Sequence, residues 1–227
     1  MILALLVLAV AVDQPFRSTE EMQQWLTYYY LKPRPQLTLA SLVVMDRELQ
    51  KTKGRSLADE VSRGGMRTFY AKLFAQNDSL VSEVEQKLPS LPPSQRTFLR
   101  EAFRRCSTSA CERVLRVSLP PSKAAWQAEP ETLDDSWAAF FATGDAKYVR
   151  EVIKVLPWSE LHGDVDRLLA GSAARWSLAS NAYQHARVLT ICEEVASTSK
   201  DPTKRLLEAI VAGAKAERAK NPPPEPK

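Results

Sequence analysis

The chain has 227 residues, which is enough for one large domain or two small ones with a substantial core. With 44% apolar residues, 26% charged residues and a formal charge of +4, its composition excludes collagen-like, wholly disordered and polytopic membrane proteins. Only 7 Gly against 15 Pro, and only two His, disfavour phosphate-binding loops, tight hairpins and histidine-rich metal sites.

The first 12 residues are continuously apolar and stop at Asp13. As a helix this segment would span about 18 Å, which is too short to cross a bilayer. It has the length of the apolar part of a signal peptide, and Ala9 to Ala11 provide the small residues that signal peptidase accepts. We therefore expect cleavage after Ala11 and export to the periplasm or the medium, with no transmembrane span afterwards. Because no Lys or Arg precedes the run, the alternative is an uncleaved apolar arm packed on the protein.

The basic residues do not follow the pattern of a nucleic-acid-binding protein. Half of the formal charge of +4 lies in the segment from residue 214 onward. The most basic stretch contains Arg96, Arg100, Arg104, Arg105, Arg113 and Arg116. It could engage anionic lipid, nucleic acid or an acidic partner, but without an aromatic ladder we interpret it as a solvated helix face. We expect no nucleic-acid partner.

Three cysteines are few for an exported protein of this size. Cys106 and Cys111 flank a polar turn between two expected helices, so a disulfide across that turn is a candidate in an oxidising compartment. The bond needs the turn, because residues five apart in one continuous helix point in different directions. Cys192 lies on an apolar helical face with Val188 and Ile191, and we interpret it as a buried thiol.

Apolar residues recur at helical spacing almost throughout the chain, and start and stop signals are frequent. The capping box Ser18-Thr19-Glu20-Glu21 begins the first helix, which the prolines at 33 and 35 end. Further helices are expected at residues 39–49, 68–76, 78–88, 94–105, 132–142, 145–156, 164–179, 184–196 and 202–220. The sequence thus predicts an all-α fold of about nine to eleven helices. Gly171 and Gly213 fall inside these helices, where close packing is the expected reason.

Proline-rich stretches divide the chain. Residues 118–131 carry three prolines and no long period, so they form the best internal connector. We expect an N-terminal helical half over residues 13–117 and a C-terminal helical half over residues 132–220. The last segment, 221–227, has the sequence NPPPEPK and should be an extended or disordered tail.

Two segments align without a gap, WLTYYYLKPRPQLTLASLVVM from Trp25 and WAAFFATGDAKYVREVIKVLP from Trp137. Each predicts an aromatic helix, a break and a second amphipathic helix, which indicates stacked helix pairs that are too small to bury their own faces. The alternative is coincidence, because any helical hairpin has aromatic residues near its turn and a cap after it.

This pattern resembles tetratricopeptide-type αα repeats, although the signature Trp-x2-Leu-Gly-x2-Tyr is absent. The resemblance implies a right-handed stack of antiparallel helix pairs. The segments DDSWAAFFATGDAKYV (residues 134–149) and AARWSLASNAYQHARV (residues 173–188) are similar to an uncharacterised family of exported bacterial helical proteins. That second likeness covers mainly the C-terminal half and implies no activity.

The most distinctive polar and aromatic cluster lies between residues 176 and 185. Trp176 could provide a stacking wall, while Ser180, Asn181 and His185 supply hydrogen bonds to a peptide or glycan. We favour a structural interpretation, in which Trp176 belongs to an inward-facing stripe and Asn181 caps the helix. That stripe comprises Val165, Leu168, Leu169, Ser172, Trp176 and Ala179.

Catalytic and metal-binding signatures are poor. Ser197 to Lys200 match Ser-x-x-Lys, but the companion segments of that enzyme class are missing, so the match is interpreted as chance. His162 and Asp164 could bind a metal, but a turn followed by a capped helix explains them equally well. Asp134, Asp135 and Asp145 each precede an apolar run and are interpreted as caps. We expect no metal and no cofactor.

The sequence therefore favours an exported, non-enzymatic helical-repeat module that binds a protein, a peptide or an envelope component. Its aromatic-lined face would include Trp25, Tyr28, Trp137 and Trp176. One alternative is an envelope hydrolase with a site around His185 or His162. Another is a structural subunit of an envelope assembly.

Overall fold

The computed structural model describes residues 16–59, 64–116 and 130–223, and within them the chain folds into α-helices without any strand. The all-α prediction is confirmed. The helices are α1 (Thr19–Thr27), α2 (Thr38–Lys53), α3 (Gly64–Ala75), α4 (Asp78–Lys87), α5 (Pro93–Cys106), α6 (Ser109–Leu115), α7 (Pro130–Thr143), α8 (Ala146–Val155), α9 (Val165–Gln184), α10 (Ala186–Thr198) and α11 (Thr203–Lys220). The described residues also include the 3-10 helices η1 (Pro35–Leu37), η3 (Leu88–Ser90) and η4 (Leu156–Glu160).

Several expected segments lie outside the described residues, namely the apolar leader, most of the 118–131 connector and the end of the tail. Among the helices that are described, none is both long enough and apolar enough to cross a membrane.

Side-chain caps begin three helices where the sequence predicted them. The Ser18 hydroxyl accepts a hydrogen bond from the Glu21 N–H at 3.2 Å and starts α1. The Asp145 carboxylate accepts one from the Lys147 N–H at 2.9 Å and starts α8. Asp164 caps α9 in the same way. These bonds satisfy backbone donors that have no partner inside the helix.

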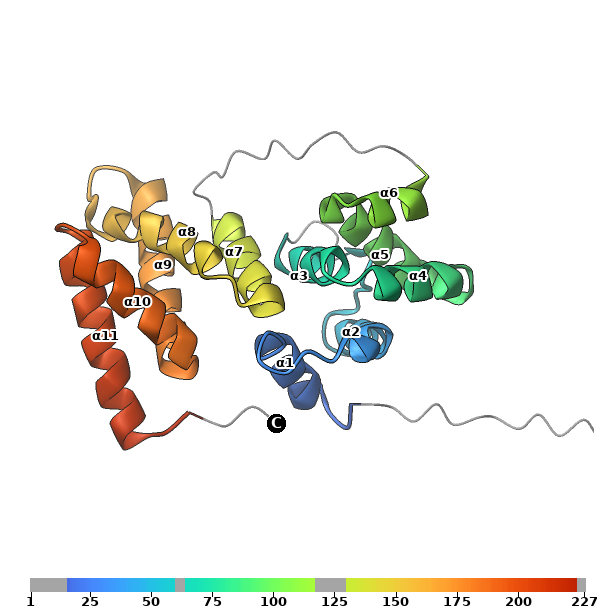
Figure 1. Ribbon diagram of the computed structural model, residues 1–227, viewed down its shortest axis with the longest axis horizontal. Helices are drawn as coiled ribbons and strands as arrows, with labels where there is room; N and C mark the ends of the chain where they lie inside the picture. Colours follow the sequence, from blue (N-terminus) through green and yellow to red (C-terminus); the bar gives the residue numbers. More distant parts are fainter. Residues whose placement is uncertain (1–15, 60–63, 117–129, 224–227) are drawn as a thin grey trace, which may run out of the picture.

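The helices form two hydrophobic cores (Figure 1). The first is built by α1 to α6 and is rich in aromatic rings. Trp25 contacts Tyr29 and Phe69 edge-on at 5.5 and 5.7 Å between centroids, and Phe74 stacks on Phe103 at 4.5 Å. The second core is built by α7 to α11 and is mostly aliphatic, with Leu133, Val149 and Leu178 among its members.

Helix α7 lies between the two cores and packs against α3 on one side and α8 on the other (Figure 1). A polar cluster reinforces the α3 contact. The Thr68 hydroxyl donates to the Asp135 carboxylate at 2.6 Å, and the Arg105 guanidinium pairs with the same carboxylate at 3.0 Å. The two predicted halves are therefore joined through residues 132–143.

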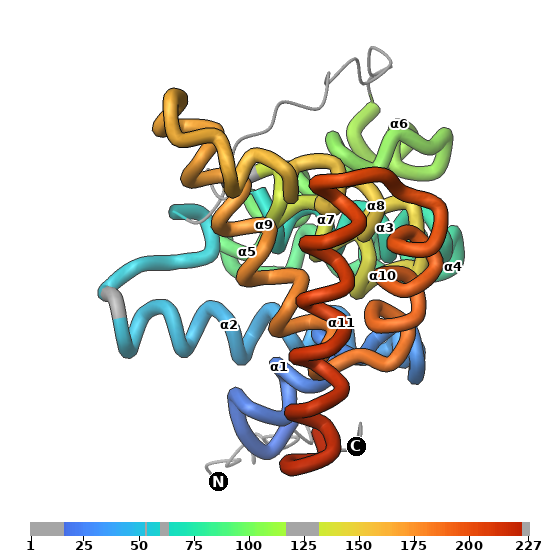
Figure 2. The backbone as a smooth tube through the Cα atoms, turned by 90° about the vertical axis from the view of Figure 1, so that its left-hand side faces the viewer, coloured from blue at the N-terminus to red at the C-terminus, as the bar shows by residue number. Residues whose placement is uncertain are grey.

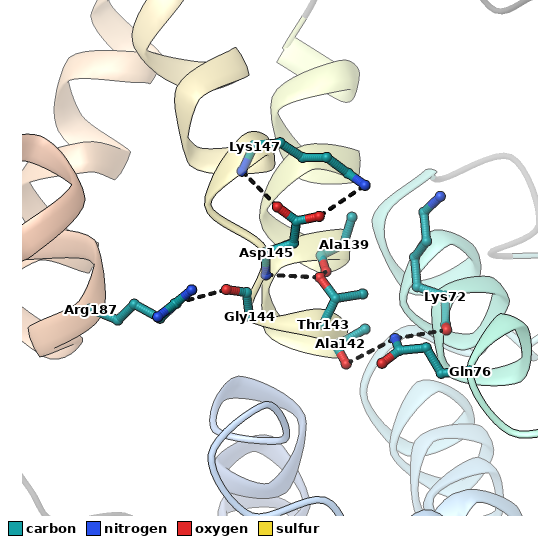
Figure 3. A network of polar contacts seen from close by, with 9 residues as sticks. All are labelled: Lys72, Gln76, Ala139, Ala142, Thr143, Gly144, Asp145, Lys147 and Arg187. Carbon is teal, nitrogen blue, oxygen red and sulfur yellow. Dashed lines mark hydrogen bonds and ion pairs between the residues drawn. The ribbon is translucent and has the colours of Figure 1, made fainter. Parts of the chain in front are cut away.

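The corner between α7 and α8 links two further helices, as Figure 3 shows. Gly144 adopts φ +68°, a left-handed conformation that suits glycine, and its carbonyl accepts from the Arg187 guanidinium of α10 at 2.7 Å. The Gln76 amide at the end of α3 donates to the Ala142 carbonyl at 3.5 Å. The corner thus fixes α10 and α3 relative to α7.

The two glycines inside helices behave differently. A Cβ added at Gly171 would collide with the Ser159 nitrogen and the Trp158 carbonyl carbon of η4, so the expected close packing is confirmed. A Cβ at Gly213 would meet nothing within 4 Å, so the same expectation was wrong there. Gly213 faces open space on α11.

Candidate functional site

The cluster that the sequence predicted around α9 does not form one site. Trp176 is 75% exposed, whereas His185 is only 1% exposed and belongs to the interior. The two side chains cannot bind one ligand, because one faces solvent and the other is enclosed by aromatic rings. The interpretation of Trp176 as a core residue was also wrong.

Ser180 and Asn181 lie inside α9, which continues to Gln184 instead of ending near residue 179. The Asn181 amide donates to the Ser177 carbonyl at 2.9 Å, and the Ser180 hydroxyl accepts from Gln184 at 3.4 Å. Asn181 is therefore not the C-cap. His185 occupies that position, and its N–H donates to the Asn181 carbonyl at 2.8 Å.

His185 is held in a neutral, structural role. Its Nδ1 atom and the Tyr30 hydroxyl form a hydrogen bond of 3.1 Å, and its ring lies 4.9 Å from Tyr28 and 5.3 Å from Phe141. Burial, with a smaller contribution from the Arg218 charge, lowers the pKa of His185 to about 4. Burial likewise raises the pKa of Tyr30 to about 12. Neither group is set to exchange protons at neutral pH.

Three other candidate binding residues, Trp25, Tyr28 and Trp137, are buried. Trp25 is part of the first core, and its indole N–H donates to the Arg34 carbonyl at 3.2 Å. Trp137 stacks on Phe141 in the second core, with 6.1 Å between centroids. The predicted aromatic-lined face is therefore wrong for these three residues, since they stabilise the fold and reach no ligand.

The structure instead exposes one apolar stripe on α9. Val165, Leu169 and Trp176 are 67%, 60% and 75% exposed, and Ser172 between them is also exposed. We call these four residues the α9 outer stripe. At 100° per residue they fall within about 60° of one another around the helix, over a length of about 16 Å. The described residues have six exposed large hydrophobic side chains, and three of them belong to this stripe.

A groove of about 410 Å³ lies between α9 and α11, next to the C-terminal end of the stripe. The two helices lie side by side at the surface (Figure 2). Its lining includes Arg175, Ala179, Tyr183, Ala209, Gly213 and Glu217. The small residues on α11 and the open space at Gly213 leave room for another segment of polypeptide above the groove.

The disulfide candidate is present in the structure, where Cys106 and Cys111 are bonded with Cα atoms 6.2 Å apart. The bond spans the turn between α5 and α6, where Ser107 takes a left-handed conformation with φ 57°. Cys192 is a free, buried thiol whose pKa burial raises to about 12. It is therefore protonated and unreactive at neutral pH.

Several arginines of the basic stretch are used within the protein. Arg104 pairs with Glu101, Arg105 with Asp135 and Arg113 with Glu85. Arg96 and Arg100 line an open hollow of about 480 Å³ with Pro89 and Pro93. Three of the six arginines of the stretch are therefore engaged in ion pairs within the protein.

The two histidines lie in different surroundings. His185 has a tyrosine as its polar partner, and His162 is exposed in the loop before α9. Asp164 caps α9 and Asp145 caps α8, which agrees with their interpretation as caps. Asp134 and Asp135 lie inside α7, where the Asp135 carboxylate binds Thr68 and Arg105, so their interpretation as caps was wrong. In the part of the chain that the structure describes, no three His, Cys, Asp or Glu side chains gather to hold a metal ion.

Comparison of the chain with protein-family models, with curated proteins and with solved structures found no match.

Proposed function

We propose that this chain is an exported, non-enzymatic module that binds a protein partner through the α9 outer stripe. The observation that carries the proposal is the alignment of Val165, Leu169 and Trp176 on the face of α9 that is turned away from the core. Export is supported by the apolar run of residues 1–12, which has the length and the small residues of a signal peptide.

Exposure of the three large apolar side chains of the stripe to water is energetically unfavourable. Burying a large apolar side chain gains about 1.5–3 kcal/mol, so three such side chains represent unused binding free energy. A helix that needed them only for folding would turn them inward. Trp is also the residue type that most often dominates binding at protein interfaces. The stripe is therefore suited to bury its side chains against another protein.

The spacing favours a helical partner. Positions i, i+4, i+7 and i+11 form a straight seam, and such a seam packs against a second helix with their side chains interlocked. The groove between α9 and α11 begins on α9 at Arg175, next to Trp176, and provides room for the partner's flanking residues. Arg175 and Glu217 at its edges offer charges of both signs to the rim of such a contact.

We also propose that the helices are a degenerate stack of antiparallel pairs, with α10 and α11 at its C-terminal end. The support comes from the chain order of contacts, because α7 packs on α8, α9 on α10, and α10 on α11. In a stack of this kind each pair packs only against its neighbours in the chain.

Photocrosslinking tests the proposal. A photoreactive amino acid is placed at Ser172, in the middle of the stripe, and in a matched variant at Gln86, an exposed position on α4. In cells of the native host, illumination should give one discrete polypeptide adduct from position 172 and none from position 86. Equal labelling from both positions, or no adduct from 172, would contradict a partner on α9.

A further inference from the structure

We infer that the partner of the α9 outer stripe is a second copy of this chain, docked antiparallel about a twofold axis. The inference rests on the proposed function and specifies its partner. The observation that carries it is the order of residues along the stripe. When a second copy of the stripe runs antiparallel to the first, its large side chains lie opposite small ones.

The complementarity follows from symmetry. A twofold axis perpendicular to two facing helices pairs residues that lie equally far from a common centre. With the centre midway between the levels of residues 170 and 171, Val165 lies opposite Trp176 of the second copy. The same centre places Leu169 opposite Ser172. One register therefore accounts for all four residues of the stripe.

The paired side chains also match in size. The large indole of Trp176 meets the smaller Val165, and Leu169 meets the short Ser172, so each bulky group has room on the opposite helix. A parallel pair would place Trp176 against Trp176 and Ser172 against Ser172, which combines a collision with a gap. The antiparallel register avoids both.

Charge does not oppose this contact. None of the four stripe residues is charged, and the nearest charged residues, Asp166 and Arg175, point to opposite sides of the seam by helical geometry. Both remain at the rim, where charges are tolerated because they keep their water.

The area of the stripe determines the affinity that we expect for the dimer. A standard interface buries about 800 Å² on each partner, and three large side chains provide roughly half of that area. The groove between α9 and α11 can add to it. We therefore expect a reversible dimer that forms with increasing concentration.

Sedimentation equilibrium of the purified protein over about a hundredfold range of concentration tests the inference. We expect a monomer–dimer equilibrium, which Trp176→Ser weakens by about tenfold or more. Leu31→Ser removes another exposed hydrophobic side chain, outside α9, and should leave the dimer unchanged. Because Trp176 and Leu31 are both exposed, circular dichroism should show that both variants fold as the parent does.

Engineered cysteines test the register. A mixture of the Leu169→Cys and Ser172→Cys variants should form an intermolecular disulfide on mild oxidation, more readily than either variant alone. Crosslinking of Ser172→Cys with itself in preference to the mixture would overturn the antiparallel arrangement.

The outcomes also separate the two proposals. A protein that stays monomeric at every concentration, or a dimer that Trp176→Ser does not weaken, overturns the second copy as the partner. If photocrosslinking from Ser172 still gives an adduct with a different polypeptide, the proposed function stands although the partner is not a second copy of this chain. If neither a dimer nor an adduct forms, both proposals fail.

Discussion

The two faces of α9 differ in composition and in what they contact. The inner face carries Ala170, Gly171, Ala174, Leu178 and Ala182, all buried against η4, α10 and α11. The outer face carries Val165, Leu169 and Trp176, which are larger and exposed. A hydrophobicity scale based on transfer free energies alone would predict that the face with Val165, Leu169 and Trp176 is buried and the face with the alanines is exposed. The comparison shows that close approach of backbones decides which side of this helix is buried.

The inner face stabilises the protein through short distances. At Gly171 the absence of a Cβ lets α9 approach the backbone of η4, and the alanines extend the same close contact. The outer face contributes little to folding, because its side chains have few neighbours to lose.

Truncation of a leucine on each face should give the largest contrast. Leu178 is fully buried, so Leu178→Ala should lower the free energy of unfolding by about 3 kcal/mol through lost contacts and a cavity. Leu169→Ala should change it by less than about 0.5 kcal/mol. Urea denaturation of the two variants measures both values. Similar losses in the two variants would show that the outer face is also part of the core.

Adding a single methyl group at each glycine separates tight from open positions. Gly171→Ala should destabilise the protein by about 2–3 kcal/mol, because its Cβ meets the η4 backbone and not a movable side chain. Gly213→Ala should stabilise it by about 0.5–1 kcal/mol, because alanine loses less backbone entropy in a helix. The midpoint temperature of thermal unfolding should be highest for Gly213→Ala, intermediate for the parent and lowest for Gly171→Ala. A stable Gly171→Ala variant would contradict the close approach.

His185 should make the protein sensitive to mild acid. Its pKa is about 4 in the folded protein and near 6.5 when unfolded, so the unfolded chain takes up a proton that the folded chain refuses. The resulting stability is complete above pH 6.5 and is lost progressively as the pH falls toward 4. Between pH 7 and pH 5 the free energy of unfolding should fall by about 2 kcal/mol on this account.

The control for this effect is His185→Gln, which cannot take up a proton. Its unfolding free energy, measured by urea denaturation at each pH, should depend less steeply on pH over the same interval. An unchanged slope would show that other groups cause the acid sensitivity.

Much of the fold follows from local sequence signals. Ser18, Asp145 and Asp164 cap helices where short polar side chains precede apolar runs, and the positive φ of Gly144 accompanies a break between helices. These features depend on a few neighbouring residues, so one sequence contains the information they need. The end of α9 was placed too early because Ser180 and Asn181 are weak helix formers, and tertiary packing carries the helix past them.

The candidate surface could not be predicted in the same way. Both faces of α9 are apolar, and hydrophobicity ranks Trp176 and Leu169 above Ala174 and Gly171, so periodicity indicated the wrong face. The burial of Trp25, Tyr28 and Trp137 depends on contacts between helices far apart in the chain. Gly171 was the one sequence signal for the true inner face, because glycine inside a helix usually marks a close approach.

The most direct test of the account is the ¹⁹F NMR signal of Trp176 in protein labelled with 5-fluorotryptophan, in which single Trp→Phe variants assign the signals of Trp25, Trp137 and Trp176 among the five. In dilute protein this signal should shift between H₂O and D₂O as an exposed ring does, while those of Trp25 and Trp137 should not. As the concentration rises, the Trp176 signal should lose its solvent sensitivity and the other two should stay unchanged. A Trp176 signal already protected from solvent in dilute protein would contradict the account, because the outer face of α9 would then belong to the core.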